Sequence, residues 1–232
     1  MRRRNILVVL ALAIALAGAI AGPLQQILSA IPGAVAASPV TLDSGNKSAD
    51  AALTNGNLTA TDSDAGSVNY PNALSTTSKS SGLVYVEYTY NVFTAADSGI
   101  SIGVSVQPPD LDSDYPGDYA GSIGVAPDGE SFMDGAFLGT VSAAAVTAGQ
   151  VQAMAVNFNT RKAWIRGPGG WVGNPVAGTG ATFDGFSAQA AWFFDLALSN
   201  HLDQITVNFG ASAFAYTIPT GFSSWDGSQV GP

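Results

Sequence analysis

Hydrophobic and polar residues alternate along most of the chain after Val40, and turn residues interrupt the alternation about every ten positions. In the stretch GLVYVEYTYNVF, Val84 and Tyr88 share one face, whereas Glu87 lies on the opposite face, which we expect to face water. A period of two predicts β-strands. No stretch beyond residue 40 sustains an apolar period of about 3.6 residues over a helix length; only TVSAAAVTAGQ is ambiguous.

The same alternation recurs in seven other segments, which are residues 53–61, 99–107, 151–159, 162–167, 171–175, 190–198 and 204–211. The Asn55-Gly56 dipeptide in the first of these is a strong turn signal. We expect about ten to twelve strands without an internal break. The economical fold is therefore all-β, with one domain of two packed antiparallel sheets over residues 41–232, a β-sandwich.

The chain ends close to an aromatic, glycine-rich stretch, ITVNFGASAFAYTIPTGFSSWDG, which contains no basic residue. Strand alternation predicts that Phe209 points into the core, and Gly210 permits the chain to bend directly afterwards. We expect Phe222, completed by Trp225, to close the open end of the sandwich. This stretch is thus predicted to have a structural role: it packs against the sandwich and closes it, and we call it the C-terminal latch.

Residues 1–40 form a separate predicted unit. Arg2–Arg4 precede the apolar run Ile6–Gly22, which is predicted to be an apolar helix. One interpretation is a secretory signal, with a small-residue cleavage site at Ala34–Ala36 or, closer, at Ala19–Ala21. The other is a retained helix that is anchored in a membrane through residues 6–22 or packed against copies of itself. Its length is at the lower limit for spanning a bilayer.

Charge narrows the range of partners. The chain has a net charge of −9, and without the three N-terminal arginines five basic residues face 17 acidic ones, a net of −12. A domain with this much negative charge repels the phosphate backbone of DNA or RNA, which excludes nucleic acid as a partner. There is no cysteine, so neither disulfides nor thiolate chemistry contribute.

Catalytic constellations are not apparent, and we expect no enzyme. The two glutamates, Glu87 and Glu130, are far apart in sequence, unlike the paired carboxylates of a glycosidase. Ser199 and Asp203 flank the single histidine, His201, but SNHLDQ is predicted to be a polar turn. No cofactor is expected.

The acidic segment PPDLDSDYPGDY is the most suggestive cluster. Asp110, Asp112 and Asp114 repeat at the spacing that opens a calcium-binding loop. The pattern then fails, because Tyr115 replaces the required glycine and Gly121 replaces the bidentate glutamate. We therefore interpret the segment as a solvated acidic loop, with calcium binding as the alternative.

Aromatic residues near loops are further binding candidates, because their flat faces suit sugar rings or protein partners. We expect Trp164 and Trp192 to lie in the core and Trp171, after a Gly-Pro-Gly-Gly turn, to be more exposed. The complete set of candidate ligand-binding residues is Asp110, Asp112, Asp114, Tyr115, Asp118, Tyr119, Phe132 and Trp171.

Several motifs appear in order along the chain. They are TLDSGNKSADAALTNGNLTATDS, SSGLVYVEYTY, YPGDYAGSIGVAPDGESFMDG, AVNFNTRKAWIRGPGGWVGNPVAGTGATFDGFS and the C-terminal NFG, FAY and PTGF. Together they resemble the SPRY-like domains with a concanavalin A-like jelly-roll sandwich that occur in bacteriophage and bacterial proteins. The resemblance covers Thr41–Gly227. The chain departs from it at Gln150, Asn157 and Asn159, where aspartates are usual, and at Gly167–Gly170, where an Asn-Gly turn is usual.

This resemblance implies a virion structural protein on the particle surface or in a tail fibre, which recognises a host-surface glycan or another virion protein. The N-terminal helix would then mediate self-association or contact other virion proteins. A secreted or envelope-anchored bacterial lectin-like protein is the alternative. A filament subunit with the apolar helix as its core is a third possibility. The virion function is an analogy, because a fold does not determine a function.

Overall fold

Residues 39–65, 69–93 and 100–232 are described by a computed structural model of the chain. These residues belong to one unit, Pro39–Pro232. The predicted apolar helix, its membrane contact and both cleavage sites lie outside the described residues. Within the described ranges, no helix has the length and apolar character needed to cross a membrane.

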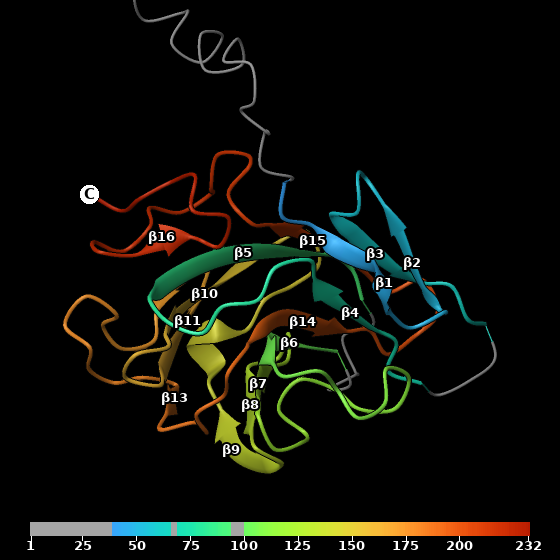
Figure 1. Cartoon of the computed structure of the whole chain (residues 1–232), viewed down its shortest axis with the longest axis horizontal. Coiled ribbons are helices and arrows are strands. Elements are labelled where there is room, and N and C mark those ends of the chain that lie inside the picture. The colour runs from blue at the N-terminus through green and yellow to red at the C-terminus, as the bar shows by residue number, and fades with distance from the viewer. Residues whose placement is uncertain (1–38, 66–68, 94–99) are drawn as a thin grey trace, which may run out of the picture. The chain divides into compact units, whose positions relative to one another are not determined.

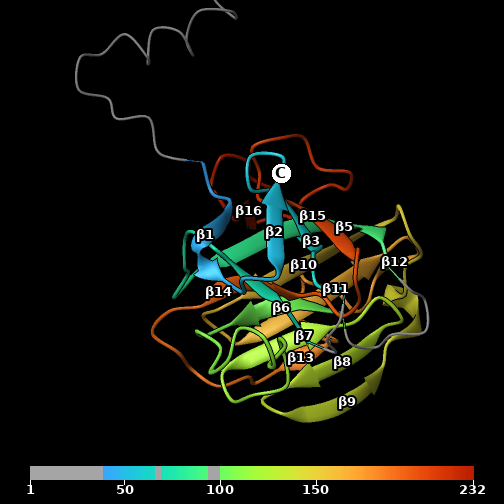
Figure 2. The ribbon, with the colours of Figure 1, turned by 90° about the vertical axis from the view of Figure 1, so that its right-hand side faces the viewer.

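Two β-sheets make up the described unit (Figures 1 and 2). The seven-stranded sheet contains, in spatial order, β1 (Leu42–Lys47), β4 (Asn72–Ser75), β14 (Phe193–Ala197), β6 (Ser101–Ser105), β7 (Ser122–Val125), β8 (Glu130–Met133) and β9 (Ala136–Thr140). All neighbouring strands in it are antiparallel. The predicted antiparallel two-sheet sandwich is therefore confirmed.

The second sheet has nine strands. Its main path is β12 (Gly170–Trp171), β11 (Lys162–Gly167), β10 (Val151–Asn157), β5 (Leu83–Val92), β15 (Gln204–Asn208), β3 (Thr59–Asp62) and β2 (Ala51–Thr54), with β13 (Phe183–Asp184) beside β11 and β16 (Ser223–Ser224) beside β5. Only the short β16 runs parallel to its neighbour. The described residues thus contain more strands than predicted, because two-residue strands such as β12 are too short to show an alternating pattern. The ambiguous segment forms a 3₁₀ turn, Ser142–Ala144.

The main core lies between the sheets. Ile102 and Val104 of β6 and Met154 and Val156 of β10 belong to one buried cluster, which therefore joins the two sheets. Aromatic rings connect the same layers, since the ring centroids of Tyr88 on β5 and Phe194 on β14 are 5.9 Å apart. This burial is the principal source of stability in a chain without disulfides.

The prediction that the Glu87 face of β5 is exposed to water is wrong. Glu87 is only 3% exposed, and Tyr85, on the same face, is fully buried. This face belongs to a second apolar cluster on the outside of the nine-stranded sheet, where Tyr85 and Trp164 pack against Ile218 and Phe222. The alternation along β5 identified its two faces correctly, but the C-terminal segment covers the face that we expected to meet solvent.

The C-terminal stretch is a latch, but its two aromatic residues lie in different clusters. Trp225, which we expected to complete a plug with Phe222, enters the main core between the sheets. Phe222 does not close the open end of the sandwich; it packs on the outer face against Trp164, with ring centroids 6.4 Å apart. Gly210 makes the bend possible, because its φ is +130° and a Cβ there would lie 2.5 Å from the Cβ of Ser224.

Candidate binding surface

The hairpin of β8 and β9 lies at one edge of the seven-stranded sheet, at the bottom of the view in Figure 1. Its turn is Asp134-Gly135, and both residues have positive φ values, 51° and 84°. That is the geometry that Asp-Gly favours in a two-residue hairpin. The Asp134 carboxylate fixes the turn to the rest of the domain by accepting the N–H of Gly121 at 2.7 Å and the hydroxyl of Ser187 at 3.1 Å.

Four aromatic rings form a continuous row beside this hairpin. The centroid of Tyr70 is 5.2 Å from that of Tyr115, Tyr115 is 5.8 Å from Phe132, and Phe132 is 5.3 Å from Phe137. Phe137 is 57% exposed, and the other three are half-buried. We call Tyr70, Tyr115, Phe132 and Phe137 the aromatic row.

The backbone of the preceding loop lies directly on β8. Gly117 has a φ of +100°, and a Cβ at this position would lie 2.5 Å from the Cβ of Phe132, so only glycine permits this approach. Its carbonyl accepts the N–H of Gly135 at 2.9 Å. Partial burial, and next the charge of Asp118, raise the pKa of Tyr115 to about 12, so its hydroxyl stays protonated at neutral pH.

The aspartates of the acidic loop accept hydrogen bonds from the loop's own backbone and from a neighbouring side chain. Asp110 accepts the N–H of Asp112 at 2.9 Å, and Asp114 accepts the N–H of Asp110 at 2.7 Å. Asp112 accepts the hydroxyl of Ser48. In the described part of the chain, no three acidic or histidine side chains are placed so that they could hold a metal ion. A calcium site at this loop stays a prediction from sequence.

Tyr119 points inward instead of toward the aromatic row. Its hydroxyl donates to the Asp195 carboxylate at 3.2 Å, and Ser105 donates to the same oxygen at 2.7 Å. Asp195 is fully buried on β14, and this burial raises its pKa to about 7. Tyr119 thus donates to one oxygen of a buried acid, Oδ2, and attaches the loop to the sheet.

Trp171 lies on β12, in the other sheet, and is half-buried. It packs against Tyr85 with ring centroids 6.1 Å apart, so it extends the outer apolar cluster. Trp164 and Trp192 are buried, as expected. The structure therefore brings Tyr115 and Phe132 together, with Asp118 beside them, but places Trp171 in a different sheet.

Sequence reasoning missed Tyr70 and Phe137, which complete the row. The signal for Phe137 was present, because Asp-Gly between alternating residues predicts a hairpin that pairs the positions on either side of it. Register indeed places Phe137 opposite Phe132. No local signal connects Tyr70 to Tyr115, since their contact depends on backbone hydrogen bonds between β4 and the acidic loop, such as Asn72 to Leu111 at 2.9 Å.

The chain segment that supplies Tyr115, Phe132 and Phe137 carries only negative charge. Between Ser101 and Thr160 the sequence contains seven acidic residues and no lysine, arginine or histidine. None of these carboxylates forms an ion pair with a basic side chain among the described residues. The surface therefore presents one exposed and three half-buried aromatic rings next to carboxylates that no basic side chain of the described residues pairs with.

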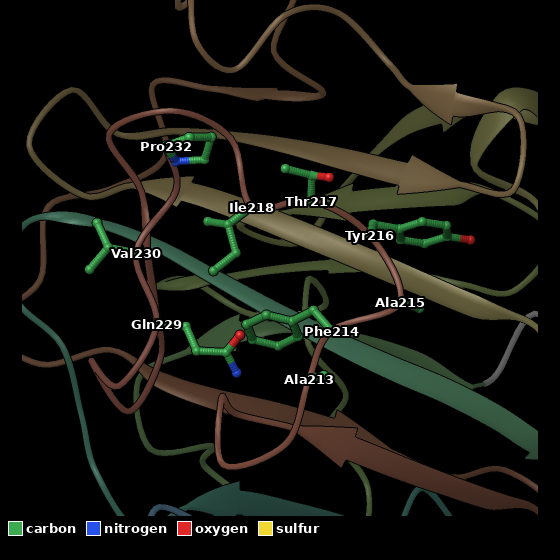
Figure 3. A pocket seen from close by; sticks show the side chains of 9 residues that line it. All are labelled: Ala213, Phe214, Ala215, Tyr216, Thr217, Ile218, Gln229, Val230 and Pro232. Carbon is green, nitrogen blue, oxygen red and sulfur yellow. The ribbon is translucent and has the colours of Figure 1, made fainter. Parts of the chain in front are cut away.

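A hollow of about 350 Å³ lies elsewhere, within the C-terminal segment (Figure 3). Phe214, Tyr216 and Ile218 line one side, and Gln229 and Val230 line the other. None of the residues predicted from sequence lines this hollow. Its walls are held by the outer cluster, because Phe214 packs edge-on against Tyr85 at 4.9 Å.

No protein-family model and no curated protein matches this chain. Solved structures do. The SPRY domain of human HERC1 is 16% identical, with 74% of this chain and 99% of that chain covered and a TM-score of 0.55. A human SPRY domain is 13% identical, with coverage of 76% and 100% and a TM-score of 0.51. The PSpry domain of TRIM65 is 12% identical, with coverage of 74% and 92% and a TM-score of 0.51. The described residues of the chain therefore have the fold of a SPRY-like β-sandwich.

Proposed function

We propose that the SPRY-like sandwich is a non-enzymatic binding module that holds a protein partner at the aromatic row. The observation that supports this most strongly is the exposure of Phe137, 57%, beside three further aromatic rings. Large contiguous apolar patches on a protein surface commonly mark interaction sites. Aromatic side chains also supply much of the binding energy at interfaces.

The surrounding charge favours a protein partner with basic residues. The acidic residues from Asp110 to Asp134 create a negative potential around the row. Lysine and arginine side chains would be attracted to it, and arginine also stacks well on aromatic faces. The two pure phenyl rings, Phe132 and Phe137, offer no hydrogen-bonding group to a sugar, which makes a glycan the weaker candidate.

The proposal includes a setting on the virion surface or in a tail fibre, supported by the resemblance of the ordered motifs to phage-encoded SPRY-like domains. In the alternative setting, a secreted or envelope-anchored protein uses residues 6–22 as its signal or anchor. Mass spectrometry of the mature N-terminus separates cleavage from retention of this segment. Micrographs of particles labelled with antibody against residues 41–232 test incorporation into virions.

A photo-cross-linking amino acid at position 137 of the full chain tests the binding surface. Position 176 is the matched control, because Val176 is also apolar and exposed, 59%, but precedes β13 on the other sheet. After irradiation of the particles or cells that contain the chain, we expect a defined, protease-sensitive product from position 137 and none from position 176.

Each other result counts against the proposal. Identical products from both positions would indicate non-specific contact, and no product from either would leave the aromatic row without a partner. A product from position 137 that resists protease but is destroyed by periodate would identify a glycan in place of a protein.

A further inference from the structure

Strand β9 ends the path of the seven-stranded sheet. It pairs with β8 on one side, and no described strand pairs with its other side. The outward N–H and C=O groups of an edge strand are a ready template for a further strand. β9 contains five residues, Ala136–Thr140, which is enough for several ladder hydrogen bonds.

The side chains of β9 do not carry the usual protection of an edge. Its sequence, AFLGT, contains no charged residue and no proline, although the register shift at Ser131 and Phe132 and the positive φ of Gly139 interrupt its regularity. Phe137 and Leu138 point to opposite faces by strand alternation, and they are 57% and 43% exposed. Both faces of this edge therefore present apolar surface to a neighbouring strand.

The negative charge near β9 distinguishes between a second copy of the chain and a basic segment of another protein as the strand that pairs with it. Glu130 pairs with Thr140 across the hairpin, and Asp134 forms its turn. Asp118 adds a third negative charge nearby, because its carboxylate acts on the hydroxyl of Tyr115 in the aromatic row. A second copy of the chain would bring the same carboxylates together and be repelled, whereas a basic segment would be attracted.

We propose that β9 is a docking edge, to which an extended segment of the partner with alternating basic and apolar residues adds as a further strand. Its backbone pairs with β9, its apolar side chains cover Phe137 or Leu138, and its basic side chains meet Glu130 and the neighbouring aspartates. This mode is β-strand addition, in which the backbone supplies affinity and the alternate side chains supply specificity. It rests on the proposed function and specifies how that partner is held.

A synthetic peptide of about seven alternating lysine and valine residues is the probe, long enough to span β9. We expect it to bind the full chain with an affinity that weakens as salt rises. Two matched peptides serve as controls: one has glutamate in place of lysine, and the other has proline in place of valine. Neither is expected to bind, because the first is repelled and the second has lost the N–H of every second residue and has a backbone that fits a strand poorly.

Two measurements on the protein locate the peptide. Leu138→Lys should weaken binding about tenfold or more by placing a like charge on the edge, whereas Val176→Lys on the other sheet should leave binding unchanged. Hydrogen exchange should slow at the outward-facing amides of β9 when the peptide is present. A ligand that covers only side chains would not protect these amides.

The outcomes separate this inference from the proposed function. Binding of the lysine peptide without protection of β9, or equal binding of the proline peptide, overturns docking at the edge. Failure of the lysine peptide to bind also overturns it, even if position 137 cross-links to a protein, in which case the binding module stands. Failure of both experiments contradicts both proposals. Self-association of the full chain that Leu138→Lys abolishes would make a second copy the occupant, contrary to our inference.

Discussion

The Glu87 carboxylate accepts the backbone N–H of Tyr216 at 2.8 Å, across 129 positions of the sequence. It also accepts the N–H of Ala215 at 2.7 Å and the hydroxyl of Tyr85 at 2.6 Å. The Arg166 guanidinium lies over the Tyr216 ring, 3.7 Å from its centroid. A buried charge is tolerated only where donors surround it, so β5 and the C-terminal segment stabilise each other through this carboxylate.

Glu87→Ala should lower the free energy of unfolding by about 3 kcal/mol, because it leaves the Tyr85 hydroxyl and two backbone donors without their acceptor. Urea denaturation of the full chain measures the change. Glu130→Ala replaces the other glutamate, which is half-exposed, and should change stability by less than about 0.5 kcal/mol. Equal effects of the two substitutions would show that Glu87 does not hold the C-terminal segment.

Phe209→Ala should cost about 3–5 kcal/mol, as is usual when a large aromatic side chain is removed from a core. Phe209 is buried in the main core, and its ring packs edge-on against Phe194 at 5.3 Å. Thermal and urea unfolding measure the loss. Phe137→Ala is the control, because the same atoms are removed from an exposed position, and it should have little effect. A Phe209→Ala variant as stable as the Phe137→Ala variant would contradict the placement of Phe209 in the core.

Asp195 should make stability depend on pH. Burial raises its pKa from 3.8 to about 7, so the folded state binds this proton more tightly than the unfolded state. The contribution of this group to stability is therefore complete below about pH 4 and is lost as the pH rises to about 7. Asp195→Asn cannot titrate, so its stability relative to wild type should increase over this range, by about 2–4 kcal/mol.

Denaturation curves of both proteins at a series of pH values provide the test. Ser105→Ala is the matched control, because it removes a hydrogen bond to the carboxylate but keeps the titrating group, and so keeps the pH dependence. Parallel pH profiles for wild type and Asp195→Asn would refute the raised pKa.

Gly210→Ala should destabilise the fold by at least about 2 kcal/mol more than Gly56→Ala does. Both glycines have positive φ, 130° and 62°, so both substitutions introduce backbone strain. Only at position 210 would the new Cβ also meet other atoms, at 2.5 Å from the Cβ of Ser224, whereas no atom lies within 4 Å at position 56. Urea midpoints of the two variants compare these costs, and indistinguishable midpoints would mean that the latch does not pack closely on the Gly210 backbone.

The hairpin at Asn55-Gly56 shows how far local pattern carries. Alternation and turn chemistry predicted it, and β2 and β3 pair around residues 55–57, all with positive φ. The aromatic row shows where local pattern ends. Tyr115 and Phe132 were predicted as separate candidates, but their contact depends on how the loop around Gly117 crosses β8, and the contact of Tyr115 with Tyr70 depends on how the acidic loop pairs with β4. Such a crossing leaves no periodic signal in the sequence.

The sequence by itself determined the all-β class, the pairing of adjacent hairpin strands and the inward direction of residues such as Phe209, because strand periodicity and turn preferences act between near neighbours. Only the tertiary structure decided that Glu87 is buried, that Phe222 packs outside the sandwich and that Tyr70 and Tyr115 join the Phe132–Phe137 pair in one surface. Periodicity states which side chains share a face of a strand. What covers that face depends on contacts between segments far apart in the chain, and these form only when the whole sandwich closes.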